Sequence, residues 1–234
     1  MTSSSNIARY WSWHPEPTQA KTAVERVYGS VSAEIVGGDL EGGTLITEGD
    51  VAEQFNVSRT PVREAFLLME AQGLLRLFPK KGAVVTTPNA REAAHLRQVR
   101  VMLESRAVEL QAASQAEAQA GQTDRDVQAA VLAADLDTLI AVQRDAAQRS
   151  DVPAFARADH QFHARVVAGS GNPIIDDFYA ALGPRLARLT CLTVRANPAE
   201  LQRFVDEHTQ LATALAAGDH RGYERLLQRH IGAT

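Results

Sequence analysis

The chain is organised around one octapeptide, Val57-Ser58-Arg59-Thr60-Pro61-Val62-Arg63-Glu64. Ser58 suits the N-cap of a helix, because its hydroxyl can accept a hydrogen bond from an unpaired N–H of the first turn. Pro61 is tolerated in that turn, since the N–H groups there have no intrahelical partner. The octapeptide therefore predicts a helix that begins after Ser58, and Gly73 is expected to end it.

This predicted helix has two unlike faces. Apolar residues recur at helical spacing and should face a core, namely Val62, Ala65, Phe66 and Met69. Arg59, Thr60 and Arg63 fall on the opposite side, with the two arginines one turn apart. Guanidinium and hydroxyl groups at the start of a short helix suit phosphates and guanine edges in a DNA major groove. The alternative is an ordinary solvated face that carries two arginines.

The residues before the octapeptide predict a helix-turn-helix. Residues 22–36 and 49–55 have helical patterns, and Thr47 is a suitable cap for the second of these helices. Asn56 then occupies the turn, where its left-handed conformation is easily accommodated. Two short helices joined by such a turn are typical of a helix-turn-helix.

The residues after the octapeptide predict a wing. Residues 74–78 and 83–86 are rich in apolar and β-branched side chains and are expected to be two strands. The turn between them carries Lys80 and Lys81, which would lie beside the DNA backbone or the minor groove.

Residues 24–87 resemble the winged-helix domain of the GntR family of bacterial transcription regulators. The resemblance rests on the stretch from Val57 to Ala65, on Glu70-Ala71-Gln72-Gly73-Leu74 and on Lys81-Gly82. It implies that four residues contact operator DNA and that Gly82 lies at the tip of the wing; the four are Ser58, Arg59, Thr60 and Arg63. Relatives often carry serine or arginine where this chain has Gly49, so we expect a contact near the DNA backbone to differ.

Composition limits the class of protein. The 234 residues allow one large or two modest domains, and a hydrophobic content of 45% supports a packed core. A net charge of −4 excludes a generally basic nucleic-acid coat, so any DNA footprint must be local, and residues 58–82 carry about +3.

The single cysteine, Cys191, excludes an internal disulfide and fits a reducing, cytoplasmic location. We find no apolar run of about 18 residues that could span a membrane, and no signal peptide.

The predicted organisation has three parts. Residues 1–20 are expected to be a flexible tail, in which Trp11 and Trp13 could pack on the first domain or be exposed. Residues 21–88 form the winged helix-turn-helix, which ends at the hinge Thr87-Pro88-Asn89. Residues 89–234 are helical throughout, so the fold class is mainly α. Six helices with short turns predict an antiparallel bundle, with expected bounds of 90–119, 124–148, 151–168, 174–194, 197–217 and 221–231.

The apolar stripes of the first two bundle helices are predicted from spacing alone. On the first helix the stripe is Leu96, Val99, Leu103, Ala107 and Leu110. On the second it is Val127, Val131, Leu136, Leu139 and Val142.

Four polar residues fall within the apolar stripes of the other helices. Asp159 and His163 are four positions apart and therefore share one helix face. His208 and His230 lie among the apolar residues of the last two helices. Burying any one of them alone costs free energy unless it is paired, whereas one divalent metal ion would satisfy all four, with zinc favoured and nickel, iron or manganese suitable. Hydrogen-bonded core histidines and an Asp159–His163 ion pair are the metal-free alternatives.

The remaining histidines lie off the stripes or near helix ends. We expect all of them on the surface, namely His14, His95, His160 and His220.

Residues 90–232 resemble the all-helical effector domain of the FadR subfamily, called the FCD domain. The resemblance rests on Arg100 with Glu104, Asp159-His160-Gln161-Phe162-His163, Gly171-Asn172-Pro173, His208, Gly218-Asp219 and His230. It implies that the metal ligands are Asp159, His163, His208 and His230. It also implies that Arg100 meets the carboxylate of a small organic acid effector. Without the resemblance, an arginine at this position could simply pair with Glu104 on the helix surface. The stretch 111–128 is longer than usual, which leaves the effector open.

Three functional hypotheses follow. The leading one is a homodimeric transcription regulator, most simply a repressor, whose two recognition helices read two half-sites of double-stranded operator DNA and whose effector alters that binding. The second is a metalloenzyme, but no further buried carboxylate or histidine stands out as a general base. The third is a DNA-binding protein whose bundle only dimerises.

Overall fold

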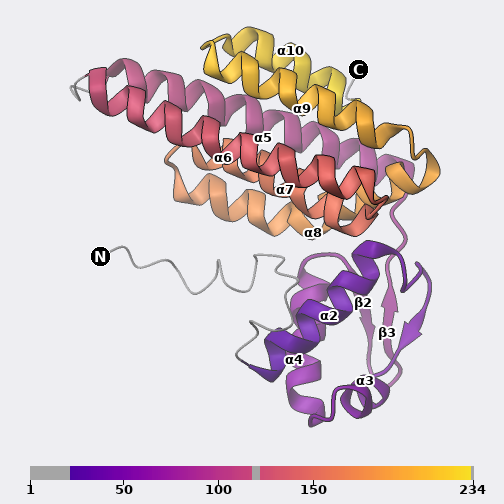
Figure 1. Ribbon diagram of the computed structural model, residues 1–234. Coiled ribbons are helices and arrows are strands. Elements are labelled where there is room, and N and C mark those ends of the chain that lie inside the picture. Colours follow the sequence, from indigo (N-terminus) through magenta and orange to yellow (C-terminus); the bar gives the residue numbers. More distant parts are fainter. Residues whose placement is uncertain (1–21, 118–121, 233–234) are drawn as a thin grey trace. The chain divides into compact units, whose positions relative to one another are not determined.

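The computed structural model describes residues 22–117 and 122–232, which form two compact units (Figure 1). The first unit contains the described residues up to Asn89 together with Ala180–Leu192, and the second contains the rest. The expected tail, Trp11, Trp13 and His14 lie outside the described residues. Among the helices that the structure describes, none combines the length and the hydropathy needed to cross a membrane.

Up to Asn89, the described residues of the first unit form three helices and a small sheet, and Ala180–Leu192 add part of a further helix. The helices are α2 (Ala23–Gly37), α3 (Glu48–Gln54) and α4 (Arg59–Ala71), and the strands are β1 (Leu45–Ile46), β2 (Leu75–Phe78) and β3 (Gly82–Val85). The sheet is antiparallel in the order β1-β3-β2, with Leu45 opposite Val84 and Leu77 opposite Ala83. This is the predicted winged helix-turn-helix; strand β1 was not predicted because two residues are too short for a period to show.

Local chemistry sets the helix starts. The Thr47 side chain accepts from the Asp50 N–H at 3.2 Å and caps α3, and Asn56 has the predicted left-handed backbone with φ 50°. Ser58 occupies the N-cap of α4, as predicted, but its hydroxyl makes no capping hydrogen bond. That part of the prediction was wrong, and the exposed hydroxyl remains available to another partner.

Helix α4 forms the centre of the first core. Its predicted apolar face is buried, with Val62, Ala65, Phe66 and Met69 each at most 1% exposed. It packs on α2, α3 and β2, and the Tyr28 hydroxyl on α2 donates to Gln72 Oε1 at 2.6 Å in the interior. Burial of one face holds the opposite, arginine-bearing face outward.

Gly82 fixes the geometry of the wing. Its φ is 104°, and a Cβ at this position would lie 2.4 Å from the carbonyl oxygen of Ile46. The backbone of β3 can therefore approach β1 only because residue 82 has no side chain.

In its described residues the second unit has helices and no strands. Helix α8 contributes residues to both units. With α8 included, the helices are α5 (Ala90–Glu117), α6 (Gln122–Gln148), α7 (Val152–Ala168), α8 (Pro173–Ala196), α9 (Glu200–Ala216) and α10 (His220–Ile231), which confirms the predicted helical bundle. The closest pairs are α6 with α7 and α9, α5 with α7 and α10, and α9 with α10, which run side by side in Figure 1. These pairs close a ring of five helices, α5-α7-α6-α9-α10, around one interior.

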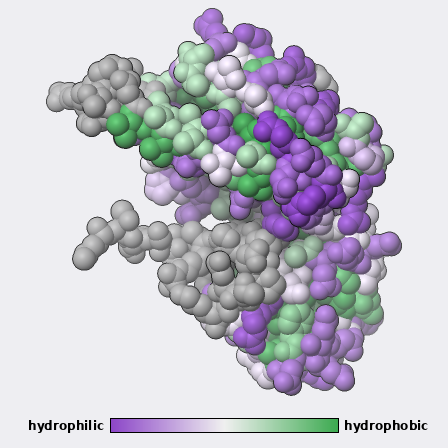
Figure 2. Space-filling model, viewed as in Figure 1, coloured by the Kyte–Doolittle hydropathy of each residue, from purple (hydrophilic) through white to green (hydrophobic). Residues whose placement is uncertain are grey.

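Two predicted stripes need correction. Val99 on α5 is 39% exposed, and Val127, Val131 and Val142 on α6 are 46–57% exposed. The buried side of α6 instead carries Leu132, Leu136, Ile140 and Gln143. The error arose because the polar residue Gln143 belongs to the buried face while valines lie on the outside. Figure 2 shows hydrophilic residues over much of the face drawn, with smaller hydrophobic patches among them.

We predict that Gly82→Ala destabilises the protein more than Gly43→Ala. Both glycines have positive φ, 104° and 90°, but a Cβ at Gly43 would meet nothing within 4 Å. The left-handed backbone should cost either variant about 1–2 kcal/mol, and the contact with Ile46 should raise the loss for Gly82→Ala to about 3 kcal/mol. Thermal unfolding of the full-length variants measures the difference, and equal losses would contradict the close approach at the wing.

Candidate metal centre and nucleic-acid interface

Four polar side chains from three helices of the ring meet in its interior. Asp159 and His163 come from α7, His208 from α9 and His230 from α10, and one possible ligand atom of each lies within 4.8 Å of the others. The His163 and His208 Nε2 atoms are 3.0 Å apart, and His208 Nε2 lies 3.3 Å from Asp159 Oδ1. All four residues are at most 5% exposed. The structure therefore brings together the four residues that the sequence analysis singled out.

Each histidine of the cluster has its outer nitrogen against a side-chain oxygen. His163 Nδ1 lies 2.6 Å from Glu104 Oε2, His208 Nδ1 lies 2.5 Å from Gln143 Oε1, and His230 Nδ1 lies 2.8 Å from Glu207 Oε2. The amide of Gln143 donates to the Ala158 carbonyl at 3.2 Å, so its oxygen faces the histidine.

These contacts determine the tautomers. Carboxylate and amide oxygens only accept, so each Nδ1 carries the proton and each Nε2 carries a lone pair. Outer-shell acceptors of this kind are typical of metal-binding histidines, whose orientation they fix. Sequence reasoning missed Glu104, Gln143 and Glu207 as members of the site.

The donor set fits a divalent metal ion. If both imidazoles are neutral with a proton on Nδ1, two Nε2 lone pairs face each other 3.0 Å apart, and they repel unless a proton or a metal ion lies between them. Two ligands each about 2.0–2.1 Å from one ion lie about 3 Å apart, which matches this separation. Three imidazole nitrogens and one carboxylate suit zinc and other first-row divalent metals. The cluster can therefore hold a metal ion, although the donors do not identify which one.

The surroundings of Asp159, His163 and His230 keep these side chains in the protonation states that bind metal ions. Burial opposes charge on Asp159, but Arg100 holds the pKa of its carboxyl well below the usual value. Burial, together with Arg100, lowers the pKa of His163, and burial lowers the pKa of His230 to about 4 despite the Glu207 contact. Around neutral pH these groups are a carboxylate and neutral imidazoles, the forms that bind metal ions.

Glu104 on α5 is a buried acceptor with four donors. Its Oε1 accepts from Arg100 Nε and from the Tyr179 hydroxyl, both at 2.8 Å. Its Oε2 accepts from His163 Nδ1 at 2.6 Å and from the Tyr223 hydroxyl at 3.5 Å. Glu104 is 0% exposed and Arg100 is 8% exposed, so the ion pair between them is internal rather than on the surface. Glu104 is thus a further buried carboxylate, but four donors leave it unsuited to act as a free base, so the sequence-based view that no general base stands out is unchanged.

One nitrogen of the Arg100 guanidinium makes no hydrogen bond. Its Nη2 is buried without a hydrogen-bond partner and lies 3.8 Å from Asp159 Oδ2. A guanidinium commonly binds a carboxylate through two N–H groups, and here Nε is already engaged by Glu104. The free edge of Arg100 can thus receive an anion next to the cluster.

His160 is not the surface residue that the sequence analysis expected. Its ring stacks on Tyr179 with centroids 5.6 Å apart and planes within 5°, and its Nδ1 is buried without a hydrogen-bond partner. Burial and the nearby Arg100 lower the pKa of His160 to about 4. The stripe on α7 failed to identify it because its neighbour is Tyr179, which lies on another helix, α8.

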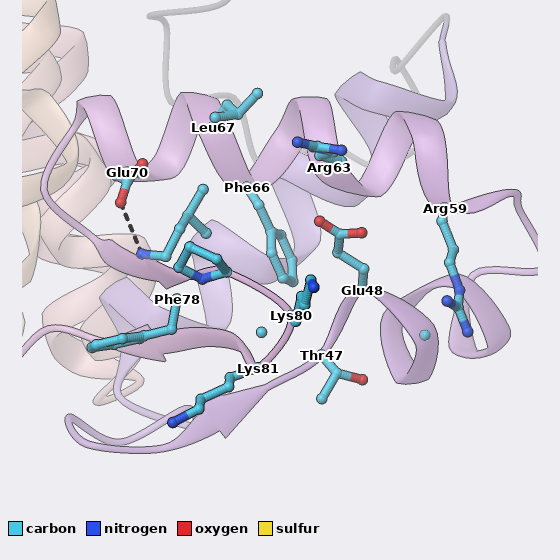
Figure 3. A pocket seen from close by; sticks show the side chains of 14 residues that line it. Thr47, Glu48, Arg59, Arg63, Phe66, Leu67, Glu70, Phe78, Lys80 and Lys81 are labelled. Atoms are coloured by element: carbon cyan, nitrogen blue, oxygen red, sulfur yellow. Dashed lines mark hydrogen bonds between the residues drawn. The ribbon is translucent and has the colours of Figure 1, made fainter.

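The second candidate site is a groove of about 740 Å³ in the first unit, between the start of α4 and the wing. Figure 3 shows side chains from both elements around it. Its lining includes four basic residues, Arg59, Arg63, Lys80 and Lys81, and two acidic ones, Glu48 and Glu70. All four basic residues are exposed, as are Ser58 and Thr60. The groove is therefore basic on balance and accessible to a polyanion.

The two acidic residues of the groove differ in their surroundings. Glu70 accepts from the Leu77 N–H at 2.8 Å and ties α4 to β2, so its charge is partly satisfied inside the unit. Glu48 lies in the groove, as Figure 3 shows, and was not identified from the sequence. A carboxylate there discourages phosphate and favours base contacts with donor groups.

Gly49 lies beside the Arg59 guanidinium. A Cβ at position 49 would be 3.4 Å from Arg59 Nη2. A methyl group at position 49 would therefore be in van der Waals contact with the Arg59 side chain without displacing it.

Comparison with known proteins gives two consistent domain matches. The family described as FCD domain matches residues 95–233, and the family described as bacterial regulatory proteins, gntR family, matches residues 23–85. Together they cover both units described above.

Curated relatives span most of the chain. The gluconate operon transcriptional repressor of Bacillus licheniformis is 26% identical over 86% of this chain and 79% of its own length. The HTH-type transcriptional repressor RspR of Escherichia coli (strain K12) is 24% identical over 92% and 87%. An uncharacterized HTH-type transcriptional regulator of Agrobacterium vitis is 32% identical over 54% of this chain and 68% of its own length.

Two solved structures share the fold. E. coli McbR/YncC superposes with a TM-score of 0.72 at 23% identity, covering 91% of this chain and 95% of the other. A regulator from Rhodococcus sp. RHA1, described as putative GntR, gives 0.71 at 19% identity over 89% and 93%. At these identities the likeness shows the fold alone.

We predict that His160 makes the stability of metal-stripped protein depend on pH. The pKa of His160 is about 4 in the folded protein against 6.5 for an ordinary histidine. Between pH 6.5 and 4 the unfolded chain therefore binds a proton that the folded chain does not. The free energy of unfolding should fall as pH drops through this window, by about 3 kcal/mol from this group.

The matched variant is His160→Phe, which keeps a ring against Tyr179 but cannot titrate. Urea unfolding in the presence of a chelator at several pH values should show a shallower pH slope for His160→Phe. The exposed His95→Phe serves as control. Identical slopes for wild type and His160→Phe would contradict a neutral, buried His160.

Proposed function

Because the chain belongs to the GntR family of bacterial regulatory proteins and carries an FCD domain, we propose that it is a repressor controlled by a small carboxylate at a metal centre. Membership of the family makes it a DNA-binding transcriptional regulator and not an enzyme. The proposal extends this to the FadR subfamily, to a metal-dependent effector site and to action as a homodimer.

One observation carries the effector part of the proposal. The Nε2 atoms of three histidines and the Asp159 carboxylate converge in a buried interior, and every Nδ1 faces an acceptor oxygen. With neutral imidazoles this arrangement points acceptors at acceptors, whereas a structural network would pair donors with acceptors. A divalent ion held by Asp159, His163, His208 and His230 resolves that conflict. We favour zinc, with nickel, iron or manganese as further candidates.

The effector is proposed to be a small organic acid. When bound, the metal ion supplies a Lewis-acidic position for a carboxylate oxygen. Arg100 supports the same choice, because its unpartnered Nη2 lies 3.8 Å from the ligand Asp159 and can bind the other oxygen. The name of one relative refers to a gluconate operon, so gluconate is a reasonable first compound to test.

The DNA part of the proposal rests on the groove at α4. Ser58, Arg59, Thr60 and Arg63 are exposed at the start of α4 and suit phosphates and base edges in a major groove. Lys80, Lys81 and Gly82 form the wing beside them. In a homodimer, two such heads would read two half-sites of a double-stranded operator in the cytoplasm. Effector and operator would then bias one equilibrium, so each alters the binding of the other by the same factor.

The proposed division of the chain follows the same roles. Residues 1–20 are a tail, residues 21–88 bind DNA, and residues 89–234 bind the effector and dimerise.

We predict that Arg59→Ala and Arg63→Ala each weaken specific operator binding by about 1–3 kcal/mol, because each removes a guanidinium from the groove. An operator is first obtained by in vitro selection, and fluorescence anisotropy then gives the affinities. Arg149→Ala is a matched control, since Arg149 is exposed just after α6 and pairs with Asp145 at 2.7 Å. Unchanged operator affinity in both test variants would show that α4 is not the recognition helix.

We predict that His208→Ala lowers the metal content of the purified protein to well below that of wild type, because one of four ligands is lost. Elemental analysis measures metal per chain. His95→Ala, on an exposed position of α5, should keep full content. Asp159→Asn, which conserves side-chain volume, covers the case in which His208→Ala does not fold. Full metal occupancy in both variants would rule out this centre, and an unaltered effector response after chelation would favour a purely structural bundle.

A further inference from the structure

We propose that Glu104 is a positioning residue that joins the metal ligand His163 to the anion-binding Arg100, so that part of the dependence between metal affinity and carboxylate affinity passes through this side chain. The inference rests on the proposed function and adds to it the residue that links its two halves.

The two oxygens of Glu104 have separate tasks. Oε2 accepts from His163 Nδ1 at 2.6 Å, and Oε1 accepts from Arg100 Nε at 2.8 Å. The tyrosine hydroxyls of Tyr179 and Tyr223 add one donor to each oxygen, at 2.8 and 3.5 Å. The carboxylate is 0% exposed, so no solvent screens these contacts and each is stronger than it would be at the surface.

The other two histidines lack such a link in the described contacts. His208 is held by the neutral amide of Gln143, and His230 by Glu207, whose other oxygen, Oε1, accepts from the exposed Arg203 at 3.4 Å. Neither Gln143 nor Glu207 has a described contact with Arg100. Arg100 therefore reaches the proposed ligands in two ways: directly at Asp159, 3.8 Å from its Nη2, and through Glu104 at His163. Glu104 is the described link from Arg100 to a ligating histidine.

The charges explain the direction of the coupling. Arg100 and His163 share the negative charge of Glu104 in the absence of an anion. A carboxylate on the free edge of Arg100 neutralises part of the guanidinium charge and leaves more of the Glu104 charge to His163. An imidazole whose Nδ1–H faces a stronger acceptor is a better ligand through Nε2. Carboxylate binding should thus tighten metal binding, and metal binding should tighten carboxylate binding by the same factor.

An amide cannot take the place of Glu104. All four groups that face its two oxygens are donors, so a glutamine would turn its NH₂ group toward either Arg100 and Tyr179 or His163 and Tyr223. Glu207→Gln is the matched control, because a glutamine there can direct its one oxygen to His230 while Arg203 finds water. The two variants remove the same charge from the outer contacts of two ligands of the same cluster.

The experiment uses full-length protein and two probes, Zn²⁺ and acetate. Zinc affinity is measured by competition with a chromogenic chelator, with and without acetate. We expect acetate to raise the zinc affinity of wild type at least threefold. Glu104→Gln should weaken zinc binding roughly 10–100-fold and clearly reduce the acetate effect, whereas Glu207→Gln should keep the full acetate effect whatever its zinc affinity.

The outcomes separate the inference from the function on which it rests. A wild type that binds no zinc overturns the proposed metal centre. A wild type that binds zinc and responds to acetate, with the response intact in Glu104→Gln, overturns the role of Glu104 alone. Zinc binding without any acetate effect in wild type overturns the coupling.

A second variant covers a failure of Glu104→Gln to fold. Arg100→Gln keeps an amide donor near Glu104 but removes the guanidinium charge. It should bind zinc at least as tightly as wild type and show a clearly reduced acetate effect. Weaker zinc binding, or an undiminished acetate effect, would contradict the inference.

Discussion

The interior of the second unit depends on three imidazole rings whose Nδ1 and Nε2 atoms cannot exchange places. Each ring gives its Nδ1 proton to a side-chain oxygen, and those oxygens come from α5, α6 and α9. The proton positions force three lone pairs and one carboxylate into the same small volume, where polar groups without partners are costly. A closed ring of five helices is what allows this, because the side chains approach from every direction at once.

In the first unit, packing in the interior fixes the orientation of side chains on the surface. Helix α4 buries Val62, Ala65, Phe66 and Met69, and this burial fixes the direction of Arg59 and Arg63 on the other face. The wing is held by the close approach of β3 to Ile46 at Gly82. Two rigid supports thus leave a basic groove between them, in which Glu48 and Glu70 moderate the positive charge.

Periodicity in the sequence was sufficient where apolar neighbours mark a face. Asp159, His163, His208 and His230 stood out because Phe, Val and Leu flank them at helical spacing. It failed for Gln143 and for the outer valines of α6, since a polar residue on the buried side reverses the apparent stripe. Glu104 and Glu207 could not be assigned, because their partners are tens to more than a hundred residues away and hydrogen bonding carries no period. His160 was misplaced for the same reason.

The short terminal helix has a special position in this architecture. Helix α10 has 12 residues, a length at which an isolated helix is marginal in water. Its inward side chains Tyr223, Leu227 and His230 attach it to the rest of the ring. An ion shared by α7, α9 and α10 would act as a cross-link between segments far apart in the chain, and its loss would remove one of the attachments of α10. The occupancy of the metal centre would then determine how tightly α10 packs against the other helices of the ring.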